Sequence, residues 1–245
     1  MTLYGDIARS TLLIECGTTR GSGFHFMQPE CVVTNNHVVE GQTKHGDAVV
    51  ASTDNGYQFQ LELVGSSPSD EHDFAIFRTR TEVPEGRVVL KPKTVESFGI
   101  GTDLAFSGFP HGIQDLLVQR AIVSGLIDEE RFYIDGSVNG GNSGGPIVDL
   151  SDGSLIGIVT QRRFLGGADL DNLQEVAVRI QEHCRRIAGR GGVQIMGIDF
   201  GAFTALMADA MVLIKEVLEA NANAGIGIGY SARFVAEECE RLGIA

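Results

Sequence analysis

The stretch Gly141–Pro146 is a glycine-packed turn that holds a single serine, Ser143, just before the apolar pair Ile147 and Val148. A serine on such a bend exposes its hydroxyl together with neighbouring backbone amides. Acyl transfer needs this combination, because an oxygen nucleophile attacks a carbonyl carbon while fixed N–H donors stabilise the oxygen that becomes negative. Glycine on both sides lets a substrate backbone come close. The alternative is an ordinary glycine-rich turn, so the rest of the chain must supply the context.

A serine hydroxyl is a weak nucleophile at neutral pH and needs a base, usually a histidine that a buried carboxylate steadies. His37 follows an expected strand at 31–34, and Asp73 directly precedes another at 74–77. Asp70 is a second candidate for the carboxylate, but it does not adjoin the strand. The sequence therefore offers a base and an orienting acid at the ends of strands.

Short apolar or alternating runs separated by turn residues fill the chain up to Arg163, a pattern typical of antiparallel barrels or sandwiches. Two sets of strands are expected, the first at 11–16, 23–27, 31–34, 48–52, 57–64, 74–78 and 87–90, the second at 103–107, 119–127, 131–135, 145–149 and 155–160. We predict a mainly β protein of two tandem antiparallel barrels, with an N-terminal lobe at 1–95 and a C-terminal lobe at 96–245. Small lobes bury little alone, so they are expected to pack together around a cleft that holds the site.

The pattern changes after Arg163. Apolar residues fall at helical spacing from Leu173 to Ile187 and again from Phe203 to Leu218. We expect, in order, a helical-hairpin insertion at about 165–223, a glycine-rich strand at 225–230 and a terminal helix at about 231–242 with Ser231 as its N-cap.

Composition limits the classes of partner and the compartment. The 245 residues carry a net charge of -13, with 19 basic and 32 acidic side chains, which argues against binding nucleic acid or an anionic membrane. The four cysteines show neither the spacing of a zinc site nor a disulfide framework, and reduced thiols are expected at Cys16, Cys31, Cys184 and Cys239. No signal-peptide pattern opens the chain and no apolar stretch is long enough to span a membrane. We therefore predict a cytoplasmic protein without metal or cofactor.

Several motifs, taken in order, make the chain resemble the chymotrypsin-like (trypsin-like) serine proteases and within them the HtrA/Deg branch. They are Gly21-Ser22-Gly23-Phe24, Thr34-Asn35-Asn36-His37-Val38-Val39, Asp73-Phe74-Ala75-Ile76, Gly108-Phe109-Pro110, Gly140-Gly141-Asn142-Ser143-Gly144-Gly145-Pro146 and Gly157-Ile158-Val159-Thr160. The resemblance covers about 8–163 and 224–242.

The resemblance implies a hydrolase that cleaves peptide bonds in protein or peptide substrates. In that family His37 would be general base and then acid, Asp73 the orienting carboxylate and Ser143 the nucleophile. The backbone N–H groups of Gly141 and Ser143 would form the oxyanion hole. No cofactor is implied.

By family position, Ser137 would lie near the floor of the specificity pocket, and Thr160, Gln161 and Arg162 would border its wall. Because the floor lacks a carboxylate, a preference for Lys or Arg is not expected. An Arg162 that faces the pocket would favour an acidic side chain or narrow the pocket to small residues. Small or medium apolar residues rank first and acidic residues second.

The chain departs from the family in two places. Asn142 stands where secreted digestive relatives have an aspartate that pairs with a freed N-terminus, so activation by N-terminal cleavage is not expected. No PDZ module fits the sequence, and the helical insertion lies in a loop that borders the specificity pocket in this family. Our hypothesis is that the insertion binds a regulatory partner or a second copy, and the alternative is a passive helical cover.

Two further interpretations stay open. The chain is either an active protease, or a catalytically silent, protease-like module that binds peptides, or the regulated protease subunit of a larger complex. An intact set of His37, Asp73 and Ser143 argues against the silent module.

Overall fold

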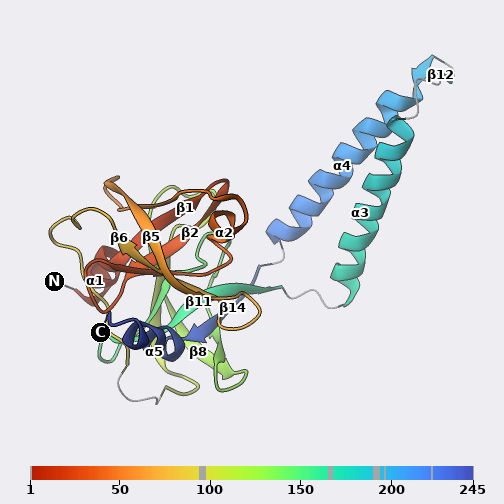
Figure 1. Cartoon of the computed structure of the whole chain (residues 1–245). Coiled ribbons are helices and arrows are strands. Elements are labelled where there is room, and N and C mark those ends of the chain that lie inside the picture. The colour runs from red at the N-terminus through yellow and green to blue at the C-terminus, as the bar shows by residue number, and fades with distance from the viewer. Residues whose placement is uncertain are drawn as a thin grey trace. The chain divides into compact units, whose positions relative to one another are not determined.

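The computed structural model describes residues 2–93, 98–164, 168–189, 194–195, 197–221 and 223–244. The chain forms two compact units, one of Met1–Arg163 with Gly225–Ala245 and the other of Phe164–Ala224. The first unit holds two closed β-barrels, and the second is a helical hairpin (Figure 1). The predicted boundary between the lobes, at 95–96, lies outside the described residues.

The first barrel closes in the hydrogen-bonded order β1-β2-β3-β6-β5-β4. Its strands are β1 (Thr11–Cys16), β2 (Thr19–His25), β3 (Cys31–Thr34), β4 (Val49–Ser52), β5 (Gln58–Ser67) and β6 (Phe74–Thr79). All neighbours pair antiparallel. Because side chains alternate across a strand, Leu12, Ile14 and Phe77 share the buried interior.

The second barrel closes in the order β10-β11-β14-β9-β8-β7. Its strands are β7 (Asp103–Gly108), β8 (Leu117–Leu126), β9 (Arg131–Asp135), β10 (Pro146–Asp149), β11 (Leu155–Phe164) and β14 (Asn223–Ser231). The neighbours β11 and β14 are separated in sequence by the helical unit, which is therefore inserted between two adjacent strands. The predicted mainly β fold of two antiparallel barrels is confirmed.

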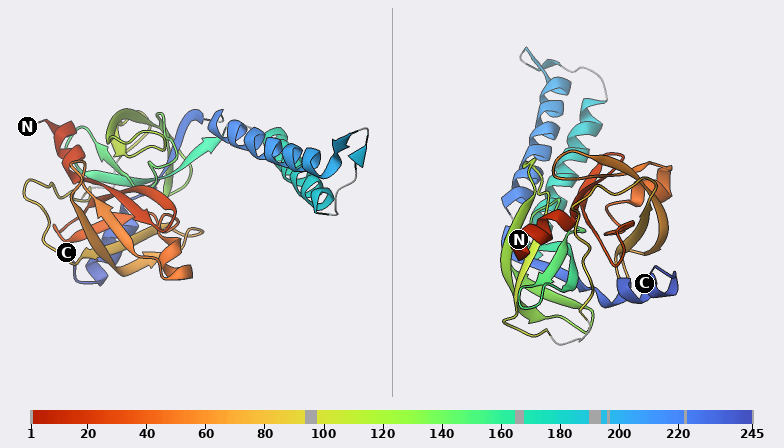
Figure 2. Two further views of the ribbon diagram at one scale, coloured as in Figure 1. Left: turned by 90° about the horizontal axis from the view of Figure 1, so that it is seen from above. Right: turned by 90° about the vertical axis from the view of Figure 1, so that its left-hand side faces the viewer.

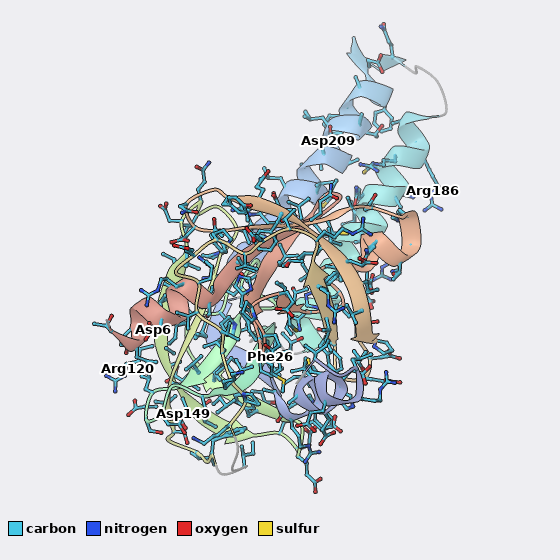
Figure 3. The ribbon with its side chains drawn as sticks, turned by 60° about the vertical axis from the view of Figure 1, so that its left-hand side comes forward. Asp6, Phe26, Arg120, Asp149, Arg186 and Asp209 are labelled. Carbon is cyan, nitrogen blue, oxygen red and sulfur yellow. The ribbon has the colours of Figure 1, made fainter. Side chains whose placement is uncertain are left out.

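Three apolar clusters hold this unit together. One fills each barrel. The third contains Phe26, which directly follows β2, Val148 from β10 and Val235 from the C-terminal helix α5 (Arg233–Arg241), so it joins both barrels to that helix. Phe26 accordingly lies in the interior of the ribbon (Figure 3).

Two short helices were not predicted from the sequence. Helix α1 (Leu3–Ser10) is capped by Thr2, whose hydroxyl accepts the N–H of Gly5 at 3.3 Å, and its buried Ile7 belongs to the third cluster. Helix α2 (Glu40–His45) follows the His37 segment. Both are too short for a clear apolar periodicity, so the sequence pattern did not reveal them.

Three details of the predicted elements are wrong. The segment 87–90 is not a strand. Leu90 makes only an isolated bridge to Phe26, and its side chain packs in the third apolar cluster. Strand β2 ends at His25, and Met27, with φ of 58°, takes a left-handed conformation that interrupts the extended backbone. Ala232 occupies the N-cap of α5; Ser231 lies one residue earlier, and its hydroxyl accepts the N–H of Arg233 at 3.3 Å.

The helical unit consists of α3 (Ala168–Ala188) and α4 (Phe200–Asn221), which lie side by side, with the two-stranded pair β12 (Gln194–Ile195) and β13 (Ile198–Asp199) between them in sequence (Figures 1 and 2). Ala177, Thr204 and Ala208 are buried, and such small side chains let two helices approach closely. Arg186 and Asp209 are exposed and point outward (Figure 3). Within the described part of the chain, no helix has the length and apolar character needed to cross a membrane.

The buried His25 on β2 predicts how stability depends on pH. Its ring stacks on Phe59, and burial, with the charge of Arg87 as a smaller cause, lowers its pKa from 6.5 to about 4. As the pH falls below 6.5, the unfolded chain takes up a proton at His25 that the native chain refuses until about pH 4. Stability is therefore lost across this window, by about 3 kcal/mol at most from this group.

Replacing His25 by leucine should remove that part of the pH dependence. Urea unfolding at pH 7 and pH 4.5 would show a smaller loss of unfolding free energy for His25→Leu than for the wild type. The exposed His45 offers a matched control, and His45→Asn should follow the wild type. Equal losses in His25→Leu and wild type would contradict the assignment.

Candidate active site

The loop between β9 and β10 carries Ser143 and depends on glycines with left-handed backbone angles. The φ of Gly141 is 92° and that of Gly144 is 86°, a region that other residues rarely adopt. A Cβ would lie 2.1 Å from the carbonyl oxygen of Ser22 if added at Gly144, and 2.3 Å from that of Phe109 if added at Gly141. Both the conformation and the space therefore require glycine.

Two backbone amides of the serine turn have no acceptor among the described residues. The N–H of Gly144 donates to the carbonyl of Val159 at 2.8 Å, which fixes the peptide after Ser143. By contrast, the N–H groups of Gly141 and Ser143 donate to no acceptor within the described parts of the chain. Free amides of this kind can stabilise an oxygen that becomes negative.

His37 and Asp73 contact each other directly. His37 Nδ1 lies 2.7 Å from Asp73 Oδ2, and the backbone N–H of His37 donates to Asp73 Oδ1 at 3.1 Å. The Asp73 side chain is 2% exposed and the His37 side chain 36% exposed. A carboxylate at Nδ1 favours the tautomer with its proton on Nδ1, which leaves Nε2 as a proton acceptor.

Two further hydrogen bonds hold Asp73 in place. The hydroxyl of Thr160, on β11 of the second barrel, donates to Asp73 Oδ2 at 2.6 Å. The side-chain amide of Asn35 donates to the Asp73 carbonyl at 2.7 Å. The φ of Asp73 is 47°, a left-handed conformation that aspartate tolerates better than most residues. Asp70, the other candidate carboxylate, is exposed.

The Ser143 hydroxyl turns toward the second barrel. Its Oγ donates to the carbonyl of Thr160 at 3.2 Å. Among the described residues no hydrogen bond joins Ser143 Oγ to the ring of His37. Thr160 thus links the two halves of the site, because its carbonyl receives Ser143 and its hydroxyl reaches Asp73.

The residues predicted to bind substrate are less fully described. Ser137 is exposed in the loop after β9, and its carbonyl accepts the side-chain amide of Asn139 at 3.2 Å. Thr160 is buried, and its hydroxyl donates a hydrogen bond to the carboxylate of Asp73. Gln161 and Arg162 lie on β11, and their side chains fall outside what the structure describes.

Sequence reasoning missed two polar contacts of the site. Asn35 and the hydroxyl of Thr160 both hold Asp73, whereas the sequence indicates Asn35 only as part of a motif and Thr160 only as part of a pocket wall. The proximity of Asn35 to His37 in sequence was the one available signal. The contact of Thr160 joins residues of different barrels, so no local pattern could reveal it.

Asn142 is buried beneath the serine turn at 1% exposure, and within the described residues its side-chain amide has no hydrogen-bond partner. A carboxylate at this position would likewise find no hydrogen-bond donor in place among the described residues.

Two closed antiparallel barrels, with a His–Asp pair and a serine turn, define the class of the chymotrypsin-like serine proteases. The profile of the family described as "Trypsin-like peptidase domain" matches residues 21–158. The chain belongs to this family, and membership places it among the serine proteases.

Relatives confirm the predicted resemblance to the HtrA/Deg branch. The "Probable periplasmic serine endoprotease DegP-like" of Brucella suis is 34% identical over 154 residues, which cover 58% of this chain and 27% of that protein. The "Periplasmic serine endoprotease DegP" of Escherichia coli K12 is 31% identical over 137 residues, covering 53% and 27%. The match thus spans only about a quarter of the length of these relatives.

Solved structures share the fold over different lengths. The Rv3671c protease of M. tuberculosis, in its inactive form, has a TM-score of 0.61 at 19% identity, covering 98% of this chain and 92% of that one. Deg5 has a TM-score of 0.55 at 26% identity, covering 64% and 82%. At 19% identity the first likeness is one of fold alone.

The partnerless amide of Asn142 predicts that a charge at this position is harmful. In Asn142→Asp the buried carboxylate would lack a cation, so its pKa would rise and stability would be lost at neutral pH. We expect a loss of a few kcal/mol at pH 7 and a smaller loss at pH 5, where the carboxyl is more often protonated. Thermal unfolding at the two pH values, with Asn142→Ala as the uncharged control, measures this. A variant Asn142→Asp as stable as wild type at pH 7 would contradict it.

Proposed function

We propose that the chain is a serine endopeptidase that hydrolyses peptide bonds through Ser143, His37 and Asp73. The observation that carries the proposal is the 2.7 Å contact between His37 Nδ1 and the buried carboxylate of Asp73. This contact leaves His37 Nε2 free to take a proton. The free amides of Gly141 and Ser143 add the second requirement of acyl transfer.

In the proposed reaction, Ser143 Oγ bonds to the substrate carbonyl carbon while its proton passes to His37 Nε2. The carbonyl electrons move to the oxygen, which accepts hydrogen bonds from the N–H groups of Gly141 and Ser143. The C–N bond then breaks, the leaving amine takes the proton from His37, and an ester remains on Ser143. Water hydrolyses the ester by the same steps, giving its proton to His37, which returns it to Ser143 Oγ.

The serine must turn before this reaction. At rest Ser143 Oγ donates to the Thr160 carbonyl rather than to His37. Rotation about one side-chain bond moves a hydroxyl between staggered positions, and catalytic hydrogen bonds often tighten only with substrate bound. We infer that substrate binding completes the Ser143–His37 contact.

A catalytically silent module that binds peptides is the second candidate. The bond from Ser143 to the Thr160 carbonyl favours it, because a serine held away from its base is not activated. The choice between the two depends on whether Ser143 reacts with an electrophile.

The proposed specificity is for small or medium apolar side chains first and acidic ones second. The support is the absence of a carboxylate at Ser137, the position expected at the pocket floor. Thr160, Gln161 and Arg162 are proposed to line the wall, and Arg162 is the proposed source of any preference for acidic residues.

Regulation through the helical unit is also proposed. On α4, the side chains of Phe203, Leu206 and Leu213 are 47%, 66% and 61% exposed. Apolar side chains at these spacings share one side of a helix and favour docking of a protein surface. We propose that α4 binds a regulatory partner or a second copy, whether the protease acts alone or within a larger complex.

A cytoplasmic location is the proposal that the sequence supports, although relatives are described as periplasmic. Its support is the state of the cysteines, since Cys16, Cys31, Cys184 and Cys239 are free thiols. Fractionation of cells that express the full-length protein would decide between the compartments.

Ser143→Ala should abolish covalent labelling by a fluorophosphonate, measured as intact mass, and lower hydrolysis of fluorescent casein on the order of 10⁶-fold. The wild type should gain a single adduct. Ser151→Ala removes an exposed hydroxyl and should label like wild type. Hydrolysis by the wild type that survives in Ser143→Ala would disprove the mechanism, and a wild type that neither labels nor hydrolyses would favour the silent module.

Asp73→Asn should lower kcat by roughly 10⁴-fold with little change in fold, because asparagine keeps the size but no longer fixes the tautomer of His37. Asparagine also tolerates the left-handed backbone at this position. Asp70→Asn is the matched control and should retain wild-type kcat. Similar losses in both variants would show that Asp73 has been given the wrong role.

Deletion of 165–223, with a short Gly-Ser turn in its place, should leave the barrels folded, because β11 and β14 are neighbouring strands. We expect it to remove self-association in analytical ultracentrifugation, or stimulation by a partner. Leu206→Glu with Leu213→Glu should give the same result without the deletion. Unchanged molecular mass, basal activity and stimulated activity after deletion would refute a regulatory role.

A further inference from the structure

The hydroxyl of Ser22, on β2 of the first barrel, reaches the serine turn of the second barrel. Ser22 is fully buried. Its Oγ donates to the carbonyl of Gly141 at 2.7 Å and accepts the N–H of Phe109 at 2.9 Å. Ser22 and Phe109 belong to two sequence motifs, Gly-Ser-Gly-Phe and Gly-Phe-Pro, that have no role in the proposed reaction.

The backbone of Ser22 holds the same turn at a second point. Its N–H donates to the carbonyl of Ser143 at 2.8 Å. Its own carbonyl accepts the hydroxyl of Thr34, on β3, at 2.6 Å. Ser22 is therefore fixed in the first barrel, and it is hydrogen-bonded to the serine turn at the carbonyls of Gly141 and Ser143.

These two contacts lie on either side of the peptide that carries the Ser143 amide. The Gly141 carbonyl sets the plane of the peptide between Gly141 and Asn142. The Ser143 carbonyl sets the plane of the peptide between Ser143 and Gly144. The peptide between Asn142 and Ser143 thus lies between two peptides that Ser22 holds, and its own carbonyl accepts the N–H of Gly145 at 2.9 Å.

The Gly141 amide is oriented by a separate bond. The N–H of His111 donates to the carbonyl of Gly140 at 2.7 Å, which holds the peptide that carries the Gly141 N–H. Loss of the Ser22 hydroxyl would leave this bond in place. It would leave the Gly141 carbonyl, on the next peptide, without its partner, while the N–H of that peptide keeps its bond to the Asn139 carbonyl at 3.1 Å. The effect should therefore fall first on the Ser143 side of the turn.

A serine suits the position for reasons of space and of bonding. A Cβ added at Gly108 would lie 2.6 Å from Ser22 Oγ, and one added at Gly21 would lie 3.0 Å from the Ser143 carbonyl oxygen. There is little room for a longer side chain. A hydroxyl both donates and accepts, so alanine would leave the Gly141 carbonyl and the Phe109 N–H without partners.

We propose that Ser22 is a positioning residue, which holds the part of the serine turn that carries the Ser143 oxyanion donor in place by its bonds to the carbonyls of Gly141 and Ser143. It touches no substrate and acts only through the turn. The inference rests on the proposed function, because it requires Ser143 to be the nucleophile and these two amides to be the donors.

Ser22→Ala tests the inference. Removing one oxyanion donor costs roughly 10²- to 10³-fold in rate, so a displaced donor should lower kcat by about 10- to 100-fold while KM changes by less than about threefold. The rate of fluorophosphonate labelling should fall by a similar factor, with kcat expressed per labelled site so that unfolded chains do not count.

Two variants complete the comparison. Ser10→Ala also removes a buried hydroxyl that donates to a carbonyl, that of Ile7 at 2.7 Å, and it should lower stability while leaving kcat and the labelling rate unchanged. Ser22→Cys keeps the shape of the side chain and a weak donor. It should recover part of the lost kcat, and it carries the test if Ser22→Ala does not fold.

The outcomes separate this inference from the function on which it rests. If Ser143→Ala abolishes labelling while Ser22→Ala, or Ser22→Cys in its place, labels and turns over at the wild-type rate, the positioning role is overturned and the proposed function stands. A rise in KM with kcat unchanged would also overturn it. If wild type and Ser143→Ala hydrolyse casein equally well, the proposed function fails and the inference falls with it.

Discussion

The structure depends on one buried negative charge, the carboxylate of Asp73. A carboxylate removed from water is costly unless hydrogen bonds replace its hydration. Asp73 receives them from His37 in the first barrel and from Thr160 in the second. Because each barrel supplies a donor, the packing of the barrels and the orientation of the imidazole ring are set together.

The serine turn depends on the same joint packing. Gly144 fits only because it lacks a Cβ that would meet the Ser22 carbonyl, and the turn in the second barrel is bonded to β2 of the first. The third apolar cluster, which contains Phe26 and Val148, supplies the attraction that keeps the barrels together. Polar contacts then fix the register of the two barrels at the site.

Local patterns were enough to predict the barrels and to select His37, Asp73 and Ser143 as candidates. Glycine around Ser143 and strands beside the other two residues carried that information. The roles of Ser22 and Thr160 could not be predicted, because their bonds cross from one barrel to the other and leave no local pattern. The prediction of a strand at 87–90 is wrong for the same reason, since apolar spacing does not show whether a partner strand is present.

The central claim is that Ser143 attacks a carbonyl whose oxygen is held by two backbone amides. A crystal structure of the chain after reaction with a fluorophosphonate tests it most directly. We predict phosphorus bonded to Ser143 Oγ, the phosphonyl oxygen within hydrogen-bond distance of the Gly141 and Ser143 nitrogens, and His37 still bonded to Asp73. A phosphonyl oxygen turned away from both amides, or phosphorus bonded to another residue, would contradict the account.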